Sequence, residues 1–94
     1  MKTFYTYILL CSDGKFYTGM TSNLPRRLAE HRAGKSISTR RRLPIQLIWS
    51  SPYFTRSEAR KMEIAIKILG ARRFLLRHFL TVGNAGLIAK YNLT

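Results

Sequence analysis

The chain has 94 residues, and 17 Lys and Arg against 4 Asp and Glu give it a formal net charge of +13. This length fits one domain with a modest core, and a hydrophobic content of 46% excludes an intrinsically disordered chain. The single cysteine excludes an internal disulfide and a zinc site built on several thiolates. No apolar run has spanning length and no signal-peptide segment is recognisable, so we expect a cytoplasmic protein.

The excess of positive charge predicts a polyanionic partner. Arginine outnumbers lysine by eleven to six, and the guanidinium group suits bidentate binding of phosphate oxygens. Neutralising phosphates releases counterions, so nucleic acid is the expected partner. A membrane surface is not expected, because no long basic amphipathic helix is evident. The ordinary alternative is a basic surface with no specific ligand.

The first two elements predict a β-hairpin. Residues 4–10 and 15–20 are rich in aromatic residues, and Gly14 between them suits a turn with positive φ. If the loop has three residues, Tyr7 pairs with Gly19 and shares a face with Tyr17. If it has two, Tyr17 lies on the opposite face from Tyr7, and the sequence leaves both registers open.

The next element is a predicted helix over residues 24–33, with Ser22 or Asn23 as its cap and Gly34 as its stop. Within it, Arg27 and His31 are four residues apart and therefore lie on one side. A basic loop follows over residues 35–43. The cations expected to bind nucleic acid lie in this helix and loop: Arg26, Arg27, Lys35, Arg40, Arg41 and Arg42.

Residues 44–50 predict a third strand with Ile45, Leu47 and Trp49 on one face and Ile48 on the other. A helix intervenes before it, so this strand cannot simply continue the hairpin. We expect it to join the sheet beside the first or the second strand.

Thr55 and Glu58 form a predicted capping box for a helix that ends at Gly70. A further helix is predicted over residues 71–80. The order β-β-α-β-α-α predicts an α+β fold, a small antiparallel sheet flanked by helices. We expect a domain over residues 1–80 and, since the rest has no firm period, a flexible C-terminal tail over residues 81–94.

Among the four acids, Glu63 stands out because it borders an apolar helical stripe that contains Ala59 and Ile66. A carboxylate there is costly unless it is paired or binds a cation. The ordinary alternative is a surface ion pair with Lys67, four residues on. With so few acids, a two-metal phosphodiesterase site is not expected, and a metal-dependent enzyme would hold one hard cation.

Two tripeptides, Thr6-Tyr7-Ile8 and Tyr17-Thr18-Gly19, are followed by Arg27, His31 and Glu63. This pattern resembles the GIY-YIG nuclease superfamily over residues 4 to about 80, and most closely its small stand-alone bacterial branch. One departure is that Tyr5, directly before Thr6, stands where the family's first motif has its glycine.

The resemblance implies a three-stranded antiparallel sheet and the register that brings the two tyrosines together. It also implies catalytic roles for Tyr7, Tyr17, Arg27 and His31, with Glu63 as the catalytic ligand of one Mg²⁺ or Mn²⁺ ion. The expected activity is metal-dependent hydrolysis of phosphodiester bonds in DNA, including branched, nicked or damaged DNA. The alternatives are a non-catalytic basic nucleic-acid-binding protein and an accessory nuclease domain that acts only with a targeting protein. Taken singly, each tyrosine also has an ordinary reading as a strand aromatic.

Overall fold

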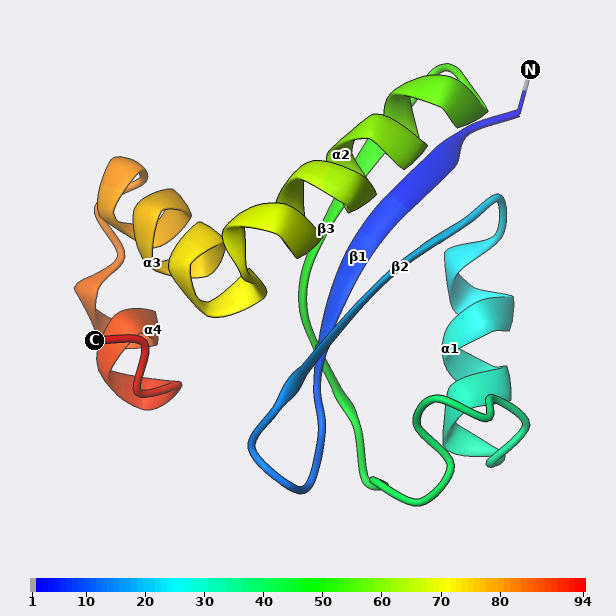
Figure 1. Cartoon of the computed structure of the whole chain (residues 1–94), viewed down its shortest axis with the longest axis horizontal. Coiled ribbons are helices and arrows are strands. Elements are labelled where there is room, and N and C mark those ends of the chain that lie inside the picture. The colour runs from blue at the N-terminus through cyan, green and yellow to red at the C-terminus, as the bar shows by residue number, and fades with distance from the viewer. Residues whose placement is uncertain (1) are drawn as a thin grey trace.

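The computed structural model describes residues 2–94. Its helices and strands follow in the order β1 (Phe4–Leu10), β2 (Phe16–Thr21), α1 (Leu24–Arg32), β3 (Gln46–Tyr53), α2 (Arg56–Leu69), α3 (Ala71–Thr81) and α4 (Ala85–Lys90) (Figure 1). The sheet is antiparallel with the strand order β2-β1-β3, so the predicted α+β class is confirmed and β3 joins beside β1. Between residues 2 and 94, every helix is too short or too polar to span a bilayer.

The hairpin takes the register of the three-residue loop. Tyr7 pairs with Gly19 and Leu9 pairs with Tyr17, so the alternative register is wrong. The Cys11 amide donates to the Lys15 carbonyl at 2.9 Å, which closes the loop directly beyond the ends of the two strands. The two tyrosines therefore project from the same face of the sheet.

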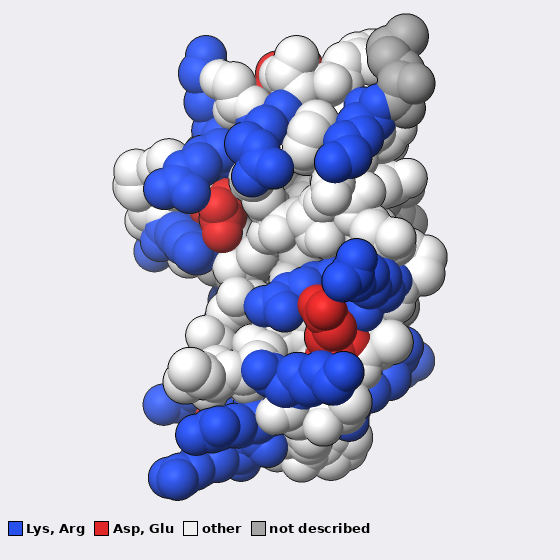
Figure 2. All heavy atoms as spheres, turned by 90° about the vertical axis from the view of Figure 1, so that its right-hand side faces the viewer, with Lys and Arg blue, Asp and Glu red and all other residues white. Residues whose placement is uncertain are grey.

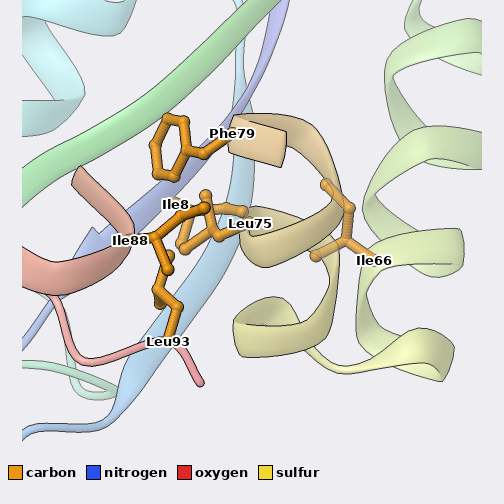
Figure 3. Packing of buried hydrophobic residues seen from close by; sticks show 6 residues of the cluster. All are labelled: Ile8, Ile66, Leu75, Phe79, Ile88 and Leu93. Atoms are coloured by element: carbon orange, nitrogen blue, oxygen red, sulfur yellow. The ribbon is translucent and has the colours of Figure 1, made fainter. Parts of the chain in front are cut away.

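The sheet separates two apolar layers. On the face that carries Tyr7, the buried residues pack towards α1 and comprise Tyr7, Leu9, Cys11, Leu28 and Ile45. The opposite face packs against the later helices through Ile8, Ile66, Leu75, Phe79, Ile88 and Leu93 (Figure 3). The Thr6 hydroxyl, on this second face, donates to the Ala59 carbonyl at 2.7 Å and ties α2 to β1.

Strand β3 differs from its prediction because it contains a register shift. Ile8 pairs with Trp49 whereas the next residue, Leu9, pairs with Leu47, so Ile48 has no partner across β1. Such a bulge reverses the alternation of side chains beyond it. Leu47 thus lies on the α1 side, and Trp49 packs in the layer of α2 and α3. The prediction that both share one face is wrong for Trp49.

The helix starts follow the predicted local chemistry. Of the two candidate caps of α1, it is Asn23 whose side chain accepts from the Arg26 amide, at 3.1 Å. The capping box of α2 is formed, since Thr55 accepts from the Glu58 amide and the Glu58 carboxylate accepts from the Thr55 amide. These caps fix the residues at which α1 and α2 begin.

The C-terminal residues differ from the expectation of a loosely held tail. Asn84 caps α4, and Ile88 and Leu93 are 8% and 2% exposed within the core cluster. Figure 3 shows both side chains directed at Leu75 and Ile8. A six-residue helix is too short to show a helical period in the sequence, which is why the pattern alone misses it.

Candidate active site

A continuous hydrogen-bonded chain joins β1, α1 and the basic loop. The phenol oxygen of Tyr7 lies 2.9 Å from Nε2 of His31, and Nδ1 of the same ring lies 2.7 Å from Oγ1 of Thr39. All three residues are at most 1% exposed. The arrangement depends on α1, because its Leu28 packs on the sheet and its next turn brings His31 over Tyr7.

Tyr17 completes an aromatic group with these residues. Its ring centroid lies 6.4 Å from that of Tyr7 and 5.4 Å from that of His31. Gly19 makes room for the group, since a Cβ at this position would lie 2.6 Å from the Tyr7 phenol oxygen. The structure therefore brings the predicted residues Tyr7, Tyr17 and His31 into contact.

Arg27 borders this group and is partly exposed. Its Nη1 donates to Glu30 at 3.2 Å, and Arg26 adds a longer contact of 3.7 Å to the same carboxylate. The Arg27 side chain is 31% exposed, so it can reach a ligand from solvent. Figure 2 looks onto the side of the molecule that carries α1, where acidic atoms lie between several cations.

Burial and the neighbouring charges perturb the ionisable groups of the cluster. Burial raises the pKa of Tyr7 to about 12, although the guanidinium of Arg27 opposes the rise and the charges of Tyr17 and Glu63 add to it. Burial also lowers the pKa of His31, with a further contribution from the Arg27 charge. At neutral pH both the phenol and the imidazole are therefore uncharged.

Burial by itself lowers the pKa of Arg27, but the phenol of Tyr7 and the carboxylate of Glu30 outweigh it and leave that pKa raised. Arg27 thus carries a permanent positive charge beside two neutral hydrogen-bonding rings. Such a site suits an anion that approaches from solvent.

Glu63 makes no hydrogen bond to the phenols within residues 2–94. It belongs to α2, which covers the opposite face of the sheet from Tyr17, and its side chain is 14% exposed. Lys67 binds its Oε2 at 3.2 Å, as the surface-pair alternative predicts. The carboxylate is nevertheless near enough for its charge to raise the pKa of Tyr7. Its link to the aromatic group is therefore electrostatic.

A metal ion at Glu63 would need most of its ligands from water. In residues 2–94, no three side chains among His, Cys, Asp and Glu are grouped closely enough to bind a metal together. Oε1 of Glu63 has no hydrogen-bond partner among residues 2–94. Every buried side-chain oxygen or nitrogen in these residues has a partner, so Oε1 is not buried. Oε1 is therefore open to water and fits a largely hydrated cation that one carboxylate holds.

The predicted nucleic-acid contacts fall into two groups. Lys35, Arg40 and Arg41 are exposed. Arg42 is instead bound to Asp13, with Nε 2.8 Å from Oδ2, and it connects the basic loop to the hairpin turn. Arg26 is also exposed, with a 3.7 Å contact to Glu30, and Arg27 is partly exposed. Lys35, Arg40 and Arg41 are thus the exposed cations of the basic loop that can meet a phosphate backbone.

Thr39 is the residue of the cluster that the sequence interpretation missed. The backbone of the predicted basic loop, residues 35–43, turns back on itself and buries Ser36 and Thr39. The sequence signal for this turn is the spacing of the two hydroxyl residues, which are three positions apart. Hydroxyl side chains often close such turns.

Comparison with known proteins agrees with this architecture. The family model of the GIY-YIG catalytic domain matches residues 3–74. A UPF0213 protein of Lactiplantibacillus plantarum is 46% identical over 70 residues, which cover 71% of this chain and 69% of that protein. A UPF0213 protein of Enterococcus faecalis is 45% identical over 71 residues, covering 72% and 81% of the two chains.

Two solution NMR structures are also similar. One is a UPF0213 protein from Bacillus halodurans, with a TM-score of 0.54, 35% identity and coverage of 83% of this chain and 84% of that one. The other, from E. faecalis, has a TM-score of 0.58, 39% identity and coverage of 86% and 90%. The matched domain is that of a nuclease superfamily and supports a nuclease-type function. On the evidence of its fold, its aromatic cluster and these matches, the chain belongs to the GIY-YIG family.

Proposed function

We propose that the protein is a metal-dependent endonuclease module that hydrolyses phosphodiester bonds in DNA. The observation that carries the proposal is the contact of Tyr7, Tyr17 and His31 beside the charged Arg27, within a GIY-YIG domain. Hydrolysis of a phosphodiester needs a nucleophile, stabilisation of the developing charge and help for the leaving group. These residues supply groups for the first two needs.

Arg27 stabilises charge in this scheme. Its partly exposed guanidinium can bind two non-bridging oxygens of the phosphate while Glu30 holds its other side. The same contact strengthens as negative charge grows on those oxygens in the transition state. Loss of one such contact costs a factor of about 10² to 10³ in rate.

The phenols and the imidazole orient and deprotonate the attacking water. A tyrosine acts as a base only as its phenolate, and with a pKa of about 12 that form of Tyr7 is scarce at neutral pH. The positive charge of Arg27 favours the phenolate and partly offsets burial. His31, which is neutral and bonded to Tyr7, holds the phenol oxygen in position.

The proposed metal ion is one Mg²⁺ or Mn²⁺ held by Glu63. When bound, it would act as a Lewis acid towards the leaving oxygen. The open Oε1 of Glu63 is the atom that would hold it.

A second function is a nucleic-acid-binding protein without turnover. The formal charge of +13 and the exposed Lys35, Arg40 and Arg41 need no catalysis to attract DNA. A targeting protein partner remains part of the first proposal, since phosphate contacts alone select no sequence or DNA shape.

One assay separates the two functions. Labelled branched, nicked and duplex DNA is incubated with the protein and Mg²⁺ or a chelator, beside the Arg27→Ala and Glu63→Gln variants. Metal-dependent cleavage that falls at least about 10²-fold in both variants supports the endonuclease. Salt-sensitive binding with no cleavage by any form supports the binding protein.

The matched control is Glu58→Gln. It makes the same chemical change on the same helix, and glutamine still fits the capping box. Cleavage by this control should equal that of the wild type. Equal loss in the Glu58 and Glu63 variants would contradict a specific role for Glu63.

A further inference from the structure

Thr39 has a buried hydroxyl whose partner is a ring of the candidate active site. Its Oγ1 lies 2.7 Å from Nδ1 of His31, and it has no second hydrogen-bond partner among residues 2–94. Thr39 and His31 are both 0% exposed. An ordinary surface-loop residue would be exposed to solvent, so the burial of Thr39 against His31 indicates a specific role.

The backbone around Thr39 is built to hold it there. The amides of Thr39 and Arg40 both donate to the Ser36 carbonyl, at 3.2 and 2.9 Å, and the Arg42 amide donates to the Thr39 carbonyl at 2.8 Å. The ion pair of Arg42 with Asp13 fixes the end of this turn to the hairpin. The turn therefore presents exposed cations outward and the Thr39 hydroxyl inward.

The number of polar hydrogens in the hydrogen-bonded series Tyr7–His31–Thr39 decides which ring nitrogen of His31 is protonated. The two hydroxyl groups and the neutral imidazole carry three hydrogens, but the chain Tyr7–His31–Thr39 has only two links. One terminal hydroxyl must therefore direct its hydrogen out of the chain. At Thr39 that hydrogen would be sealed inside the turn without an acceptor, which is costly.

At the Tyr7 end, the outward hydrogen meets a different environment. Tyr7 is itself 1% exposed, but its phenol borders Tyr17 and Arg27, which are both partly exposed, so a water or ligand bound beside them can accept from it. The favoured pattern is then that Thr39 donates to Nδ1, and Nε2–H of His31 donates to the Tyr7 oxygen.

We infer that Thr39 is a positioning residue, which holds the His31 ring in the Nε2–H tautomer with that hydrogen directed at the Tyr7 oxygen. The importance of Thr39 for cleavage rests on the proposed function, whereas the assignment of the His31 tautomer is independent of it. With Nε2–H on one side and the Arg27 charge on the other, the Tyr7 oxygen is surrounded by groups that stabilise a phenolate. The basic loop thus contributes to the chemistry of the site as well as to its charge.

The first test needs no substitution. Long-range ¹⁵N–¹H NMR spectra distinguish the two histidine tautomers, and His31→Gln assigns the signals because the chain has only two histidines. We expect Nε2–H at His31 in the wild-type protein above pH 7. Nδ1–H there would overturn the inference, whatever the protein does to DNA.

The second test removes the hydroxyl with Thr39→Val and restores it with Thr39→Ser. We expect Thr39→Val to release the single tautomer and to raise the pKa of the Tyr7 phenol, followed by ultraviolet titration with Tyr7→Phe as the reference. Thr39→Ser should restore both signals, and Thr81→Val on α3 should change neither. Unchanged His31 and Tyr7 signals in a folded Thr39→Val protein would overturn the inference.

If the protein cleaves DNA, Thr39→Val should lower kcat about 10- to 100-fold with little change in KM, the scale typical for loss of an outer partner of a functional histidine. NMR results as expected with no cleavage by any form would leave Thr39 in its role and refute the endonuclease instead. Unaltered kcat in an active enzyme whose His31 tautomer has changed would refute the catalytic importance of Thr39.

Discussion

Gly19 of β2 lies directly against the ring of Tyr7 on β1: a Cβ at position 19 would lie 2.6 Å from the phenol oxygen and 2.7 Å from Cζ. We predict that Gly19→Ala displaces this ring and breaks its contact with His31. Overpacking of this kind costs about 1–3 kcal/mol in the free energy of unfolding. Cleavage should fall by more than the loss of folded protein explains, as measured by kcat at a temperature where the variant is folded.

Gly86→Ala is the matched control for this substitution. Gly86 lies in α4, and a Cβ there would meet its nearest atom, Oδ1 of Asn84, at 3.6 Å. This variant should keep full activity and be at least as stable as the wild type, because alanine suits a helix better than glycine. Normal cleavage by a folded Gly19→Ala protein would contradict the importance of the Tyr7 position.

The ion pair between Lys67 and Glu63 predicts competition with the metal ion. Lys67→Gln removes a cation that lies 3.2 Å from the carboxylate, so it should lower the Mg²⁺ concentration that gives half-maximal cleavage. A partly exposed pair is worth up to about 1 kcal/mol, which corresponds to a shift of no more than about fivefold. Lys61→Gln, at an exposed position of the same helix, should cause no shift. A higher Mg²⁺ requirement in Lys67→Gln would contradict metal binding at Glu63.

The exposed cations of the basic loop predict a change in the salt dependence of DNA binding. A double substitution, Arg40→Gln with Arg41→Gln, should weaken binding and reduce the slope of log K against log salt by about 2, since each phosphate contact contributes about 0.9. Fluorescence anisotropy at several salt concentrations measures that slope. The melting temperature should not change.

Arg42→Gln should behave in the opposite way. Arg42 is bound to Asp13, so its loss removes a structural contact and should lower the melting temperature. Its effect on the salt slope should be smaller than that of either Arg40 or Arg41. An equal effect of all three arginines on the slope would show that Arg42 leaves Asp13 to bind DNA.

His31 predicts a loss of stability in mild acid. Burial lowers its pKa from an ordinary value of about 6.5, so below that pH the unfolded chain binds a proton that the folded chain still excludes. The free energy of unfolding should therefore fall as the pH decreases from about 6.5 to the pKa of the folded protein, and level off below it. Urea unfolding between pH 7.5 and 5 measures the slope. His31→Gln should flatten it.

The C-terminal packing predicts a stability cost at its last buried residue. Leu93 is 2% exposed in the core cluster, so Leu93→Ala should lower the free energy of unfolding by about 2–5 kcal/mol. Leu80→Ala makes the same change at a residue that is 63% exposed, and it should cost less than about 0.5 kcal/mol. Equal stability of both variants would restore the interpretation of residues 81–94 as a loose tail.

The elements that local chemistry specifies are the ones the sequence predicts well. Asn23 and the Thr55–Glu58 box mark the helix starts, and the order of strands and helices follows from hydrophobic period and turn residues. The hairpin register needed a second argument, because two- and three-residue loops suit the same strands. The resemblance to the family favoured the correct one, which the pairing of Tyr7 with Gly19 confirms.

The features that escape the sequence depend on tertiary contacts. The bulge at Ile48 arises where β3 meets β1, and nothing within residues 44–50 marks it. Likewise, the burial of Thr39 depends on a histidine from another element. For the candidate site, the contact of Tyr7 with His31 agrees with the interpretation, whereas the position of Glu63 across the sheet could not be read from helical spacing alone.

Tyr7, Tyr17, Arg27, His31 and Thr39 all come from the first 39 residues, and Glu63 alone comes from the second half of the chain. A nascent chain of which only the first half has left the ribosome therefore contains the aromatic rings and Arg27 but lacks Glu63. Under the proposed function, a nascent or truncated chain is harmless to DNA until α2 has docked on the sheet. Two separately expressed halves, divided within the loop after Arg42, should each be inert and gain activity only on reassembly.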